Sequence, residues 1–329
     1  MINRICLLAS AVSVLALLLV STASAGPATS SDRKLLAPYE PVMQFDPLEQ
    51  FRPTKVEPFI AGASLERLTA SGTWEVVAQN ASPGDLPGPG TETWRLNENA
   101  CTPNAPVGGL DCYAAAVAGG DTNTYARVVH ENETTILQYW FFYDDDVYSY
   151  AYPPSDLLWQ AHEGDWENVD VVLSDDDEPQ FVGYSQHCLG ERRDWTDTPR
   201  FDDTHPIVHV AVGSHANYFS GGTHAIDVRC IPPQAVAILQ ARGLPLPVDF
   251  SFVGPVAGPP EAGGTTMTIT RIDRHEPSWL QFPGFWGELQ YFHAPAPIGT
   301  VASGASPVGP AFHAEWVDPL RTLATWPVG

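Results

Sequence analysis

The sequence is poor in positive charge. Lys and Arg together number 16 against 39 Asp and Glu, which gives a formal net charge of −23 at pH 7. A surface of that sign repels nucleic acid and anionic lipid at long range, and it attracts divalent cations. We therefore expect no nucleic-acid partner and an acidic protein suited to an extracellular setting.

Long apolar runs are missing after residue 25. No later segment reaches the roughly 18 consecutive apolar residues that a transmembrane helix needs. Residues 1–25 themselves contain an early Arg4, a long apolar stretch and the small-residue pattern Ala23-Ser24-Ala25. This pattern predicts a secretory signal peptide cleaved after Ala25, with an uncleaved membrane anchor as the alternative. We expect the mature protein to be secreted and not transmembrane.

Cysteine is scarce, and no C-x-x-C pair occurs, which argues against a cysteine zinc site. Removal of Cys6 with the signal peptide leaves an even number, which predicts two disulfides in an exported chain. Three connectivities are open. We favour Cys101–Cys112, closing a short loop, together with Cys188–Cys230.

No internal repeat and no long linker divides the chain. The 31 Pro and 27 Gly indicate many loops, while 14 Phe, 11 Tyr and 10 Trp are too many for a disordered chain. We predict a flexible leader at residues 26–36 and a single domain over residues 37–329. Its first part, an extended Pro-rich segment at residues 35–60, is expected to be an N-terminal extension of that domain.

Alternating apolar residues predict strands in the middle of the chain. One hairpin is expected to turn at residues 131–133 and a second at residues 175–178. Further predicted elements are strands at 207–213 and 266–273 and a helix at 232–242, which starts with Pro and is followed by Gly. Together they indicate an antiparallel β-sandwich with long loops and one or two short helices.

The stretch "AHEGDWENVDVVL" places charged residues directly ahead of a β-forming run. Strand alternation puts Asp165 and Glu167 on the same face as the apolar residues 169, 171 and 173. Carboxylates that face a core must be neutralised, hydrogen-bonded or bound to a cation. His162 could close the same pocket from the incoming turn.

Two carboxylates and an imidazole suit Ca²⁺, Mg²⁺ or Mn²⁺ better than Zn²⁺. The alternatives are hydrogen bonds to loop amides at the rim of the sheet, or a general acid and base. Other acidic and histidine residues could join the site, although an aspartate run is often only a solvated turn. These further candidates are Asp144, Asp145, Asp146 and His215, with His187, Asp46 and Glu49 as weaker ones.

Covalent catalysis has little support in the sequence. Ser214 precedes His215 but lacks the G-x-S-x-G elbow that exposes a serine nucleophile. Cysteines engaged in disulfides are not nucleophiles.

Several blocks in order, including "QYWFFY", "HEGDWENVDVVL", "FVGYSQH" and "HPIVHVAVGSHANYF", resemble the Vps62-related proteins. The chain is more distantly similar to the necrosis- and ethylene-inducing peptide-like toxins. These are secreted β-sandwich proteins whose H-x-H-D-W-E core binds a divalent cation and helps engage plant sphingolipid headgroups. The resemblance implies a cation held by His162, Asp165, Glu167 and His215, with an upstream aspartate that corresponds to Asp144, Asp145 or Asp146 and for which we take Asp145.

Two departures from the toxin core bear on function. Gly164 stands at the second histidine of that core, and Glu163 replaces a basic residue. We therefore expect cation-dependent recognition of a glycan, a lipid headgroup or another small polar ligand, with peripheral membrane contact as one form of it. The alternatives are a metal-dependent hydrolase with His215 or Glu163 as proton carrier, a purely structural cation, and a membrane-active toxin.

Overall fold

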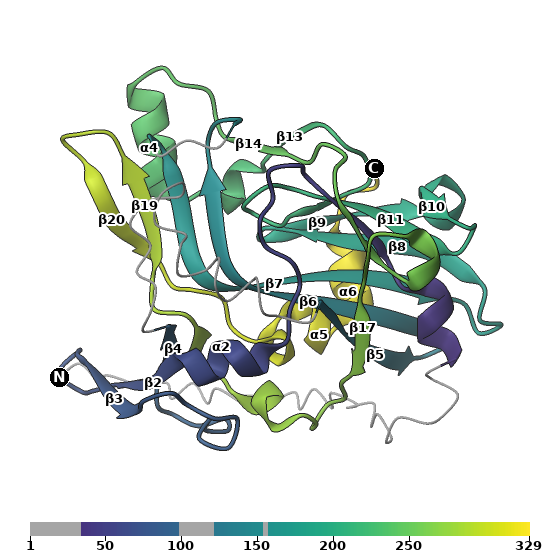
Figure 1. Ribbon diagram of the computed structural model, residues 1–329, viewed down its shortest axis with the longest axis horizontal. Helices are drawn as coiled ribbons and strands as arrows, with labels where there is room; N and C mark the ends of the chain where they lie inside the picture. Colours follow the sequence, from purple (N-terminus) through teal and green to yellow (C-terminus); the bar gives the residue numbers. More distant parts are fainter. Residues whose placement is uncertain (1–33, 99–121, 154–156) are drawn as a thin grey trace, which may run out of the picture.

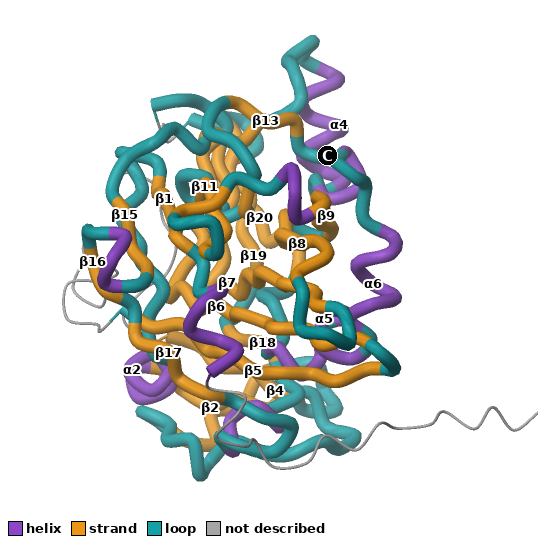
Figure 2. Tube along the Cα trace, turned by 90° about the vertical axis from the view of Figure 1, so that its right-hand side faces the viewer, coloured by secondary structure: helices purple, strands orange, loops and turns teal. Residues whose placement is uncertain are grey.

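The computed structural model describes residues 34–98, 122–153 and 157–329. Strands predominate in these residues and the helices are short, which confirms the predicted mainly β class. The strands form layered sheets (Figure 1), and α4 (Pro233–Ala241) and α6 (Pro319–Thr325) lie along one side of the molecule in the view of Figure 2. The predicted signal peptide, the first part of the leader and the pair Cys101–Cys112 lie outside the described residues.

The largest sheet is built on two long, bent strands (Figure 1). β6 (Thr134–Ser149) and β7 (Trp159–Leu173) run antiparallel and pair along nearly their whole length. The other strands of this sheet are β5 (Asn123–Glu131), β8 (Pro179–Gln186), β9 (Leu189–Asp194), β17 (Thr268–Arg271), β19 (Gln290–Ala294) and β20 (Gly299–Gly304). Both predicted hairpins, β5–β6 and β7–β8, are confirmed.

Smaller sheets pack on the two faces of β6 and β7. One contains β1 (Val42–Phe45), β10 (Arg200–Phe201), β11 (His205–Val210), β12 (Asn217–Tyr218), β15 (Val256–Gly258) and β16 (Thr265–Thr266). The other contains β2 (Ala63–Leu68), β3 (Trp74–Ala78), β4 (Trp94–Glu98) and β18 (Phe285–Trp286). A separate pair consists of β13 (Thr223–Ala225) and β14 (Val248–Phe250). The pairs β1–β11, β15–β16, β5–β17 and β4–β18 are parallel, so the sheets of this β-sandwich are mixed, although the long central pairs are antiparallel as expected.

Side-chain alternation along β6 and β7 divides the core in two. Tyr143 and Val169 pack towards β1 and β11 in one hydrophobic cluster. Phe142 and Trp166 pack in another cluster with Trp286 and with α2 (Val56–Gly62). The predicted apolar face of β7 is therefore confirmed, and Asp165, opposite Tyr143 in the ladder, stands where that face turns polar.

Four local expectations are wrong. α2 lies within the segment expected to be extended, and Leu36 of the expected leader is buried in the first cluster. β7 starts at Trp159, so His162 lies inside the strand and not on an incoming turn. Residues 144–146 are buried in β6 and do not form a solvated turn. Cross-strand pairing with β7 holds these aspartates in the sheet, a contact that local sequence does not reveal.

The predicted helix near residue 232, the strands near 207 and 266, and one disulfide are confirmed. The disulfide joins Cys188 to Cys230 across 42 residues. Short helices at the C-terminal end are α5 (Ala314–Val317) and α6. Leu323 of α6 and Trp326, directly after that helix, pack against β6 and β7. No helix in the described part of the chain is long and apolar enough to span a membrane.

Candidate metal centre

Within the part of the chain that the structure describes, the central part of β7 has a strand partner on one side only. On the edge away from β6, residues 159–161 pair with β19 and residues 169–173 pair with β8. The sheet therefore divides around residues 162–168, which is the segment that contains the acidic motif. A gap of this kind lets side chains from the strand meet loops of the neighbouring layer.

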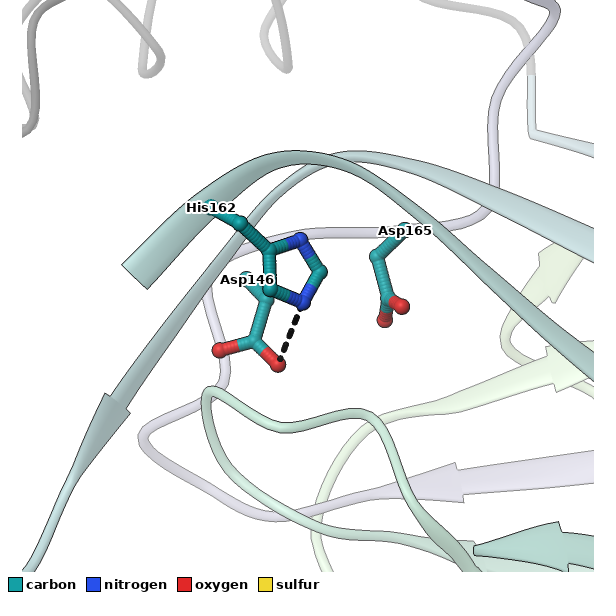
Figure 3. A group of neighbouring side chains, drawn as sticks. All are labelled: Asp146, His162 and Asp165. Atoms are coloured by element: carbon teal, nitrogen blue, oxygen red, sulfur yellow. Dashed lines mark ion pairs between the residues drawn. The ribbon is translucent and has the colours of Figure 1, made fainter. Parts of the chain in front are cut away.

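Three side chains gather at this gap. Asp146, His162 and Asp165 each offer a ligand atom, and these atoms all lie within 4.8 Å of one another. Asp146 and His162 are partners in the β6–β7 ladder, with 3.5 Å between Asp146 Oδ2 and His162 Nε2 (Figure 3). The side chains of His162 and Asp146 retain 12% and 8% of their exposure and that of Asp165 retains 10%, so the group is not sealed from solvent.

His162 is oriented as a metal ligand would be. Its Nδ1 lies 3.1 Å from the carbonyl oxygen of Gly164. A carbonyl only accepts hydrogen bonds, so this contact places the ring proton on Nδ1. The lone pair of Nε2 then faces Asp146, as is usual when a backbone carbonyl fixes a histidine ligand. Asp146 Oδ1 is buried and has no hydrogen-bond partner among the described residues, which suits an oxygen that accepts a cation.

His215 supports Asp165 from behind. Its Nδ1 donates to Asp165 Oδ2 at 2.9 Å, and its Nε2 faces Glu49 Oε1 at 3.6 Å. The ring stacks on Tyr143 with 3.8 Å between centroids. Glu49 in turn accepts from the backbone N–H groups of Phe51 and Gly213, each at 2.6 Å. Both nitrogens of the fully buried His215 ring therefore face carboxylates.

The electrostatics agree with a fixed positive charge at this position. Burial alone would lower the pKa of His215, but Glu49 and Asp165 outweigh it and raise that pKa to about 10. Burial acts against ionised Glu49 and Asp165, yet His215 holds the pKa of both below their usual values. Asp146 has less compensation. Burial raises its pKa to about 7, and the opposing effect of His162 does not cancel it.

Glu167 lies beside the three-residue group but is not part of it. Its carboxylate accepts a short hydrogen bond from Ser185 Oγ and faces Asn217 Nδ2 at 3.5 Å. Burial and the charge of Asp165 raise its pKa well above the usual range. The structure therefore places Glu167 in a hydrogen-bonded layer next to Asp165, and its role as a ligand stays a prediction.

Asp145 faces a different set of side chains from Asp146. It pairs with Glu163 in the ladder, and Glu163 Oε2 accepts from the backbone N–H of Glu98 and of Glu288 at 3.0 and 3.1 Å. The upstream aspartate that joins His162 and Asp165 is thus Asp146, where we had assigned Asp145. Glu163 is fully buried, which makes it unsuitable as a mobile proton carrier.

The backbone at Gly164 explains how neighbouring residues of one strand reach different surroundings. Its φ is +57°, a left-handed conformation that interrupts the alternation between Glu163 and Asp165. A Cβ atom at this position would lie 2.1 Å from the carbonyl oxygen of Trp286. Only glycine fits at this position without a shift of the backbone.

A small depression that is open to solvent, with a cavity volume of about 20 Å³, adjoins the group. Asp146 is part of its wall, together with Gln160 and His187. Tyr148, Tyr150 and Ile226 supply aromatic and apolar surface. A polar ligand in this pocket would therefore meet both ring faces and a carboxylate of the candidate metal centre.

The remaining candidates have structural partners. Asp249, which the sequence analysis did not single out, accepts from Ser214 Oγ at 2.8 Å, from Tyr218 and from His187 Nε2 at 2.7 Å. Ser214 and His187 thus share an acceptor and do not form a nucleophile–base pair. Asp46 accepts from the backbone of Leu48 and Phe252. The sequence contains one sign of Asp249: it is a single aspartate between two apolar residues, in "VDF".

Comparisons with known proteins give a relative among yeast proteins. No family model matches the chain. TDA6 of Saccharomyces cerevisiae, whose name provisionally assigns it to vacuolar protein sorting, is 28% identical over 191 residues. The match covers 50% of this chain and 37% of TDA6, so the chain spans well under half of that relative.

Two solved structures are similar. One is Necrosis and Ethylene inducing Protein 2 from the causal agent of cocoa's witches' broom disease, with 18% identity, 56% of this chain and 61% of that chain covered, and a TM-score of 0.28. The other is described as a toxin fold for microbial attack and plant defense, with 14% identity, 52% and 63% coverage and a TM-score of 0.28. The similarity to a Vps62-related protein and the similarity to necrosis-inducing proteins, both expected from the sequence motifs, are confirmed. The identities and TM-scores are too low to assign the activity of these proteins to this chain.

Proposed function

We propose that this protein binds a divalent cation at Asp146, His162 and Asp165 and uses it to recognise a polar ligand. The ligand class is a glycan or a lipid headgroup. Two carboxylates and one imidazole suit Ca²⁺, Mg²⁺ or Mn²⁺, ions that take six or more ligands. Three protein ligands leave positions for oxygen atoms of the ligand, so the ion would bridge protein and ligand.

The observation that carries this proposal is that Asp146 belongs to two features at once. It belongs to the candidate metal centre and to the wall of the adjacent pocket. Hydroxyl or phosphate oxygens at the ion would leave the apolar face of the ligand against Tyr148 and Tyr150. Aromatic rings with a polar tip suit this mixed contact.

Binding is better supported than hydrolysis. A proton carrier must exchange its proton with substrate or water, and it needs a pKa near the working pH. The His215 ring is buried, held by Glu49 and Asp165, and has its pKa raised to about 10. His215 is therefore suited to hold Asp165 in place and keep it ionised for the metal.

We also propose that the protein acts outside the cell. The signal-peptide pattern of residues 1–25 and the acidic surface support this location. The Cys188–Cys230 disulfide supports it as well, because disulfides persist in oxidising compartments. Mass spectrometry of the protein recovered from the medium would test both export and cleavage after Ala25.

The test of cation binding compares purified wild-type protein with Asp146→Asn and His162→Gln. Asp170→Asn is a matched control. Asp170 is a buried carboxylate of β7 that accepts a hydrogen bond from Asn168 Nδ2, and it lies outside the metal group. Calorimetric titration with Mn²⁺ and Ca²⁺ should give one site that the two site variants weaken at least tenfold and the control retains. Equal binding by all four proteins would exclude the site.

Ligand recognition is tested separately on glycan arrays and on vesicles of defined headgroup, with added cation or with EDTA. Binding should require the cation and should be weakened by Tyr150→Ala, which leaves the metal group intact. Retention of the cation without any cation-dependent ligand would indicate a structural ion. Leakage of vesicles would favour the membrane-active alternative.

A further inference from the structure

His187 lies at a tight turn in a left-handed backbone conformation. Together with Cys188 it forms the two-residue turn between β8 and β9, where Gln186 pairs with Leu189. The φ of His187 is +54°, a conformation that turns of this kind usually give to Asn or Gly. Two contacts hold the turn, namely the Cys188–Cys230 disulfide and a hydrogen bond of the His187 ring. An uncommon backbone conformation that is held in this way is often found at a binding site.

A buried carboxylate fixes the imidazole ring of His187. Asp249 of β14 has no exposed surface, and its Oδ2 lies 2.7 Å from His187 Nε2. Ser214 Oγ and the hydroxyl of Tyr218 also donate to Asp249, so three donors hold this carboxylate. An ionised carboxylate only accepts hydrogen bonds, so the contact places a proton on Nε2. The ring therefore has one orientation, in which Nδ1 is the second nitrogen.

Nδ1 is the nitrogen of His187 that a ligand can reach. Among the described residues it has no hydrogen-bond partner. It is also not one of the buried polar atoms without a partner, so it keeps contact with solvent. The side chain of His187 retains 19% of its exposure and lines the pocket beside Asp146. One ring nitrogen is thus anchored in the core while the other is open to a ligand.

The surroundings favour a positive charge on this ring. Burial alone would lower the pKa of His187, but Asp249 outweighs it and the pKa is raised. Burial also acts against ionised Asp249, yet His187 holds the pKa of that carboxyl below its usual value. Both nitrogens of an imidazolium are donors, so Nδ1 then offers an N–H to the pocket. Among the described residues that line this pocket, no other is a Lys, Arg or His.

The size of the pocket limits what can enter it. Its cavity volume of about 20 Å³ is little more than the roughly 10–15 Å³ that one water molecule needs. A whole sugar ring therefore stays at the mouth, and a single compact group enters. Asp146 is the one acidic residue of the described pocket wall. A cation at Asp146 would offset that negative charge, so the entering group would meet positive charge from the ion and from His187.

We propose that His187 Nδ1 donates a hydrogen bond to a phosphate group of the ligand, whose other oxygens coordinate the cation at Asp146. This inference rests on the proposed function and narrows its ligand class to phosphorylated glycans and phosphate-containing lipid headgroups. Phosphate is a compact anion that both kinds of ligand can carry. Hydrogen bonds between charged partners are also stronger than neutral ones. Asp249 is a positioning residue that holds the donor in place.

The first test titrates glucose 6-phosphate, glucuronate and glucose into the full chain, with Mg²⁺ or with EDTA. The proteins are wild type, His187→Gln and, as a matched control, His130→Gln at an exposed histidine. With Mg²⁺, wild type and control should bind glucose 6-phosphate more tightly than the other two sugars. His187→Gln should weaken this binding at least tenfold and keep the wild-type affinity for Mg²⁺. Folded His187→Gln with wild-type affinity for glucose 6-phosphate, or a wild-type preference for glucuronate, would overturn the proposal.

Vesicles distinguish the two sources of phosphate. Wild type is sedimented with phosphatidylcholine vesicles that contain or lack phosphatidic acid. Binding that needs phosphatidic acid, without binding of glucose 6-phosphate, would identify a lipid headgroup, and the reverse would identify a phosphorylated glycan. In either case His187→Gln must lose the binding. A wild type that binds no Mg²⁺ would refute the cation centre, whereas one that binds Mg²⁺ but neither phosphate probe would refute the present inference alone.

A double variant guards against loss of the fold. His187→Gln leaves Asp249 without the imidazolium, and Asp249→Asn in the same chain removes the uncompensated charge. The double variant should unfold at a temperature at least as high as that of His187→Gln and should still bind glucose 6-phosphate at least tenfold more weakly than wild type. If neither variant folds, wild-type crystals soaked in tungstate, a phosphate analogue, decide. An anomalous peak beside His187 Nδ1 must be present, and its absence would refute the assignment.

Discussion

His215 and Asp165 form a buried, charged hydrogen bond of 2.9 Å that joins the loop after β11 to the middle of β7. The bond fixes the carboxylate that faces the candidate cation. The same ring faces Glu49, which is itself held by backbone N–H groups. The His215 imidazolium, which lies between two carboxylates, therefore holds Asp165 in place. Removing the His215 side chain should have several measurable consequences.

Replacing His215 with Gln should destabilise the protein strongly. The substitution leaves Glu49 and Asp165 buried without the positive charge of the imidazolium. Loss of one partner from a buried ion pair costs about 3–5 kcal/mol. Urea denaturation in EDTA should show this loss. Glu49→Gln in the same chain should restore part of it, because it removes one of the uncompensated charges. A loss below about 1 kcal/mol for His215→Gln would contradict the charged arrangement.

The stability of the protein should fall as pH rises from neutrality to 10. The pKa of His215 is about 10 in the fold against 6.5 for an ordinary histidine, so the folded state holds a proton that the unfolded state releases. This contribution is complete below pH 6.5 and is lost as pH passes 10, at up to about 1.4 kcal/mol per pH unit.

The measurement is the free energy of unfolding in EDTA at intervals from pH 6 to 10. His215→Gln should lose most of the slope. His130→Gln changes an exposed histidine and should keep it. If His215→Gln kept the full wild-type slope of unfolding free energy against pH, other groups would be the cause of the pH dependence.

Opening the disulfide should lower stability without abolishing the sheets. Cys188 and Cys230 are separated by 42 positions in sequence, and closing a loop of this length is worth about 4 kcal/mol in the chain-entropy model. Cys230 also lines the pocket beside Asp146, so the pocket wall should loosen as well. Unfolding midpoints of wild type with and without reductant, and of Cys188→Ser/Cys230→Ser, measure the effect. Unchanged midpoints would show that the cross-link constrains little.

The sequence predicted those parts of the site that strand periodicity determines. Strand alternation correctly placed Asp165 on the face that continues as the apolar residues of β7. His162, three positions earlier, would lie on the opposite face of a regular strand, and the left-handed Gly164 between them interrupts that alternation. The choice between Asp145 and Asp146 depended on which residue faces His162 in the β6–β7 ladder. Adjacent identical residues carry no local signal for that register.

Long-range partners were harder still. Glu49 ranked as a weak candidate because nothing near it in sequence indicates His215, 166 positions later, as its partner. The mixed sheets have the same origin. β1 pairs in parallel with β11, about half of the chain away in sequence, and only tertiary packing selects that pairing. The hairpins, whose partners are neighbours in sequence, were predicted correctly.

Gly164→Ala tests whether the interruption in β7 creates the metal centre. The new Cβ atom would lie 2.1 Å from the carbonyl oxygen of Trp286. The alanine would also have to keep the backbone φ of +57° that Gly164 has. Left-handed backbone costs about 1–2 kcal/mol and overpacking about 1–3 kcal/mol, so a total near 2–5 kcal/mol is expected. Relief of the clash requires a shift of β7, which carries His162 and Asp165 apart. Mn²⁺ affinity should therefore fall together with stability.

Gly72→Ala is the matched control for that substitution. Gly72 has a φ of +80° but no atom within 4 Å of the Cβ position, so only the backbone term applies. It should cost about 1–2 kcal/mol and leave Mn²⁺ affinity unchanged. If Gly164→Ala resembled Gly72→Ala in both measurements, β7 would tolerate a side chain at this position. The separation of Glu163 from Asp165 would then need another cause.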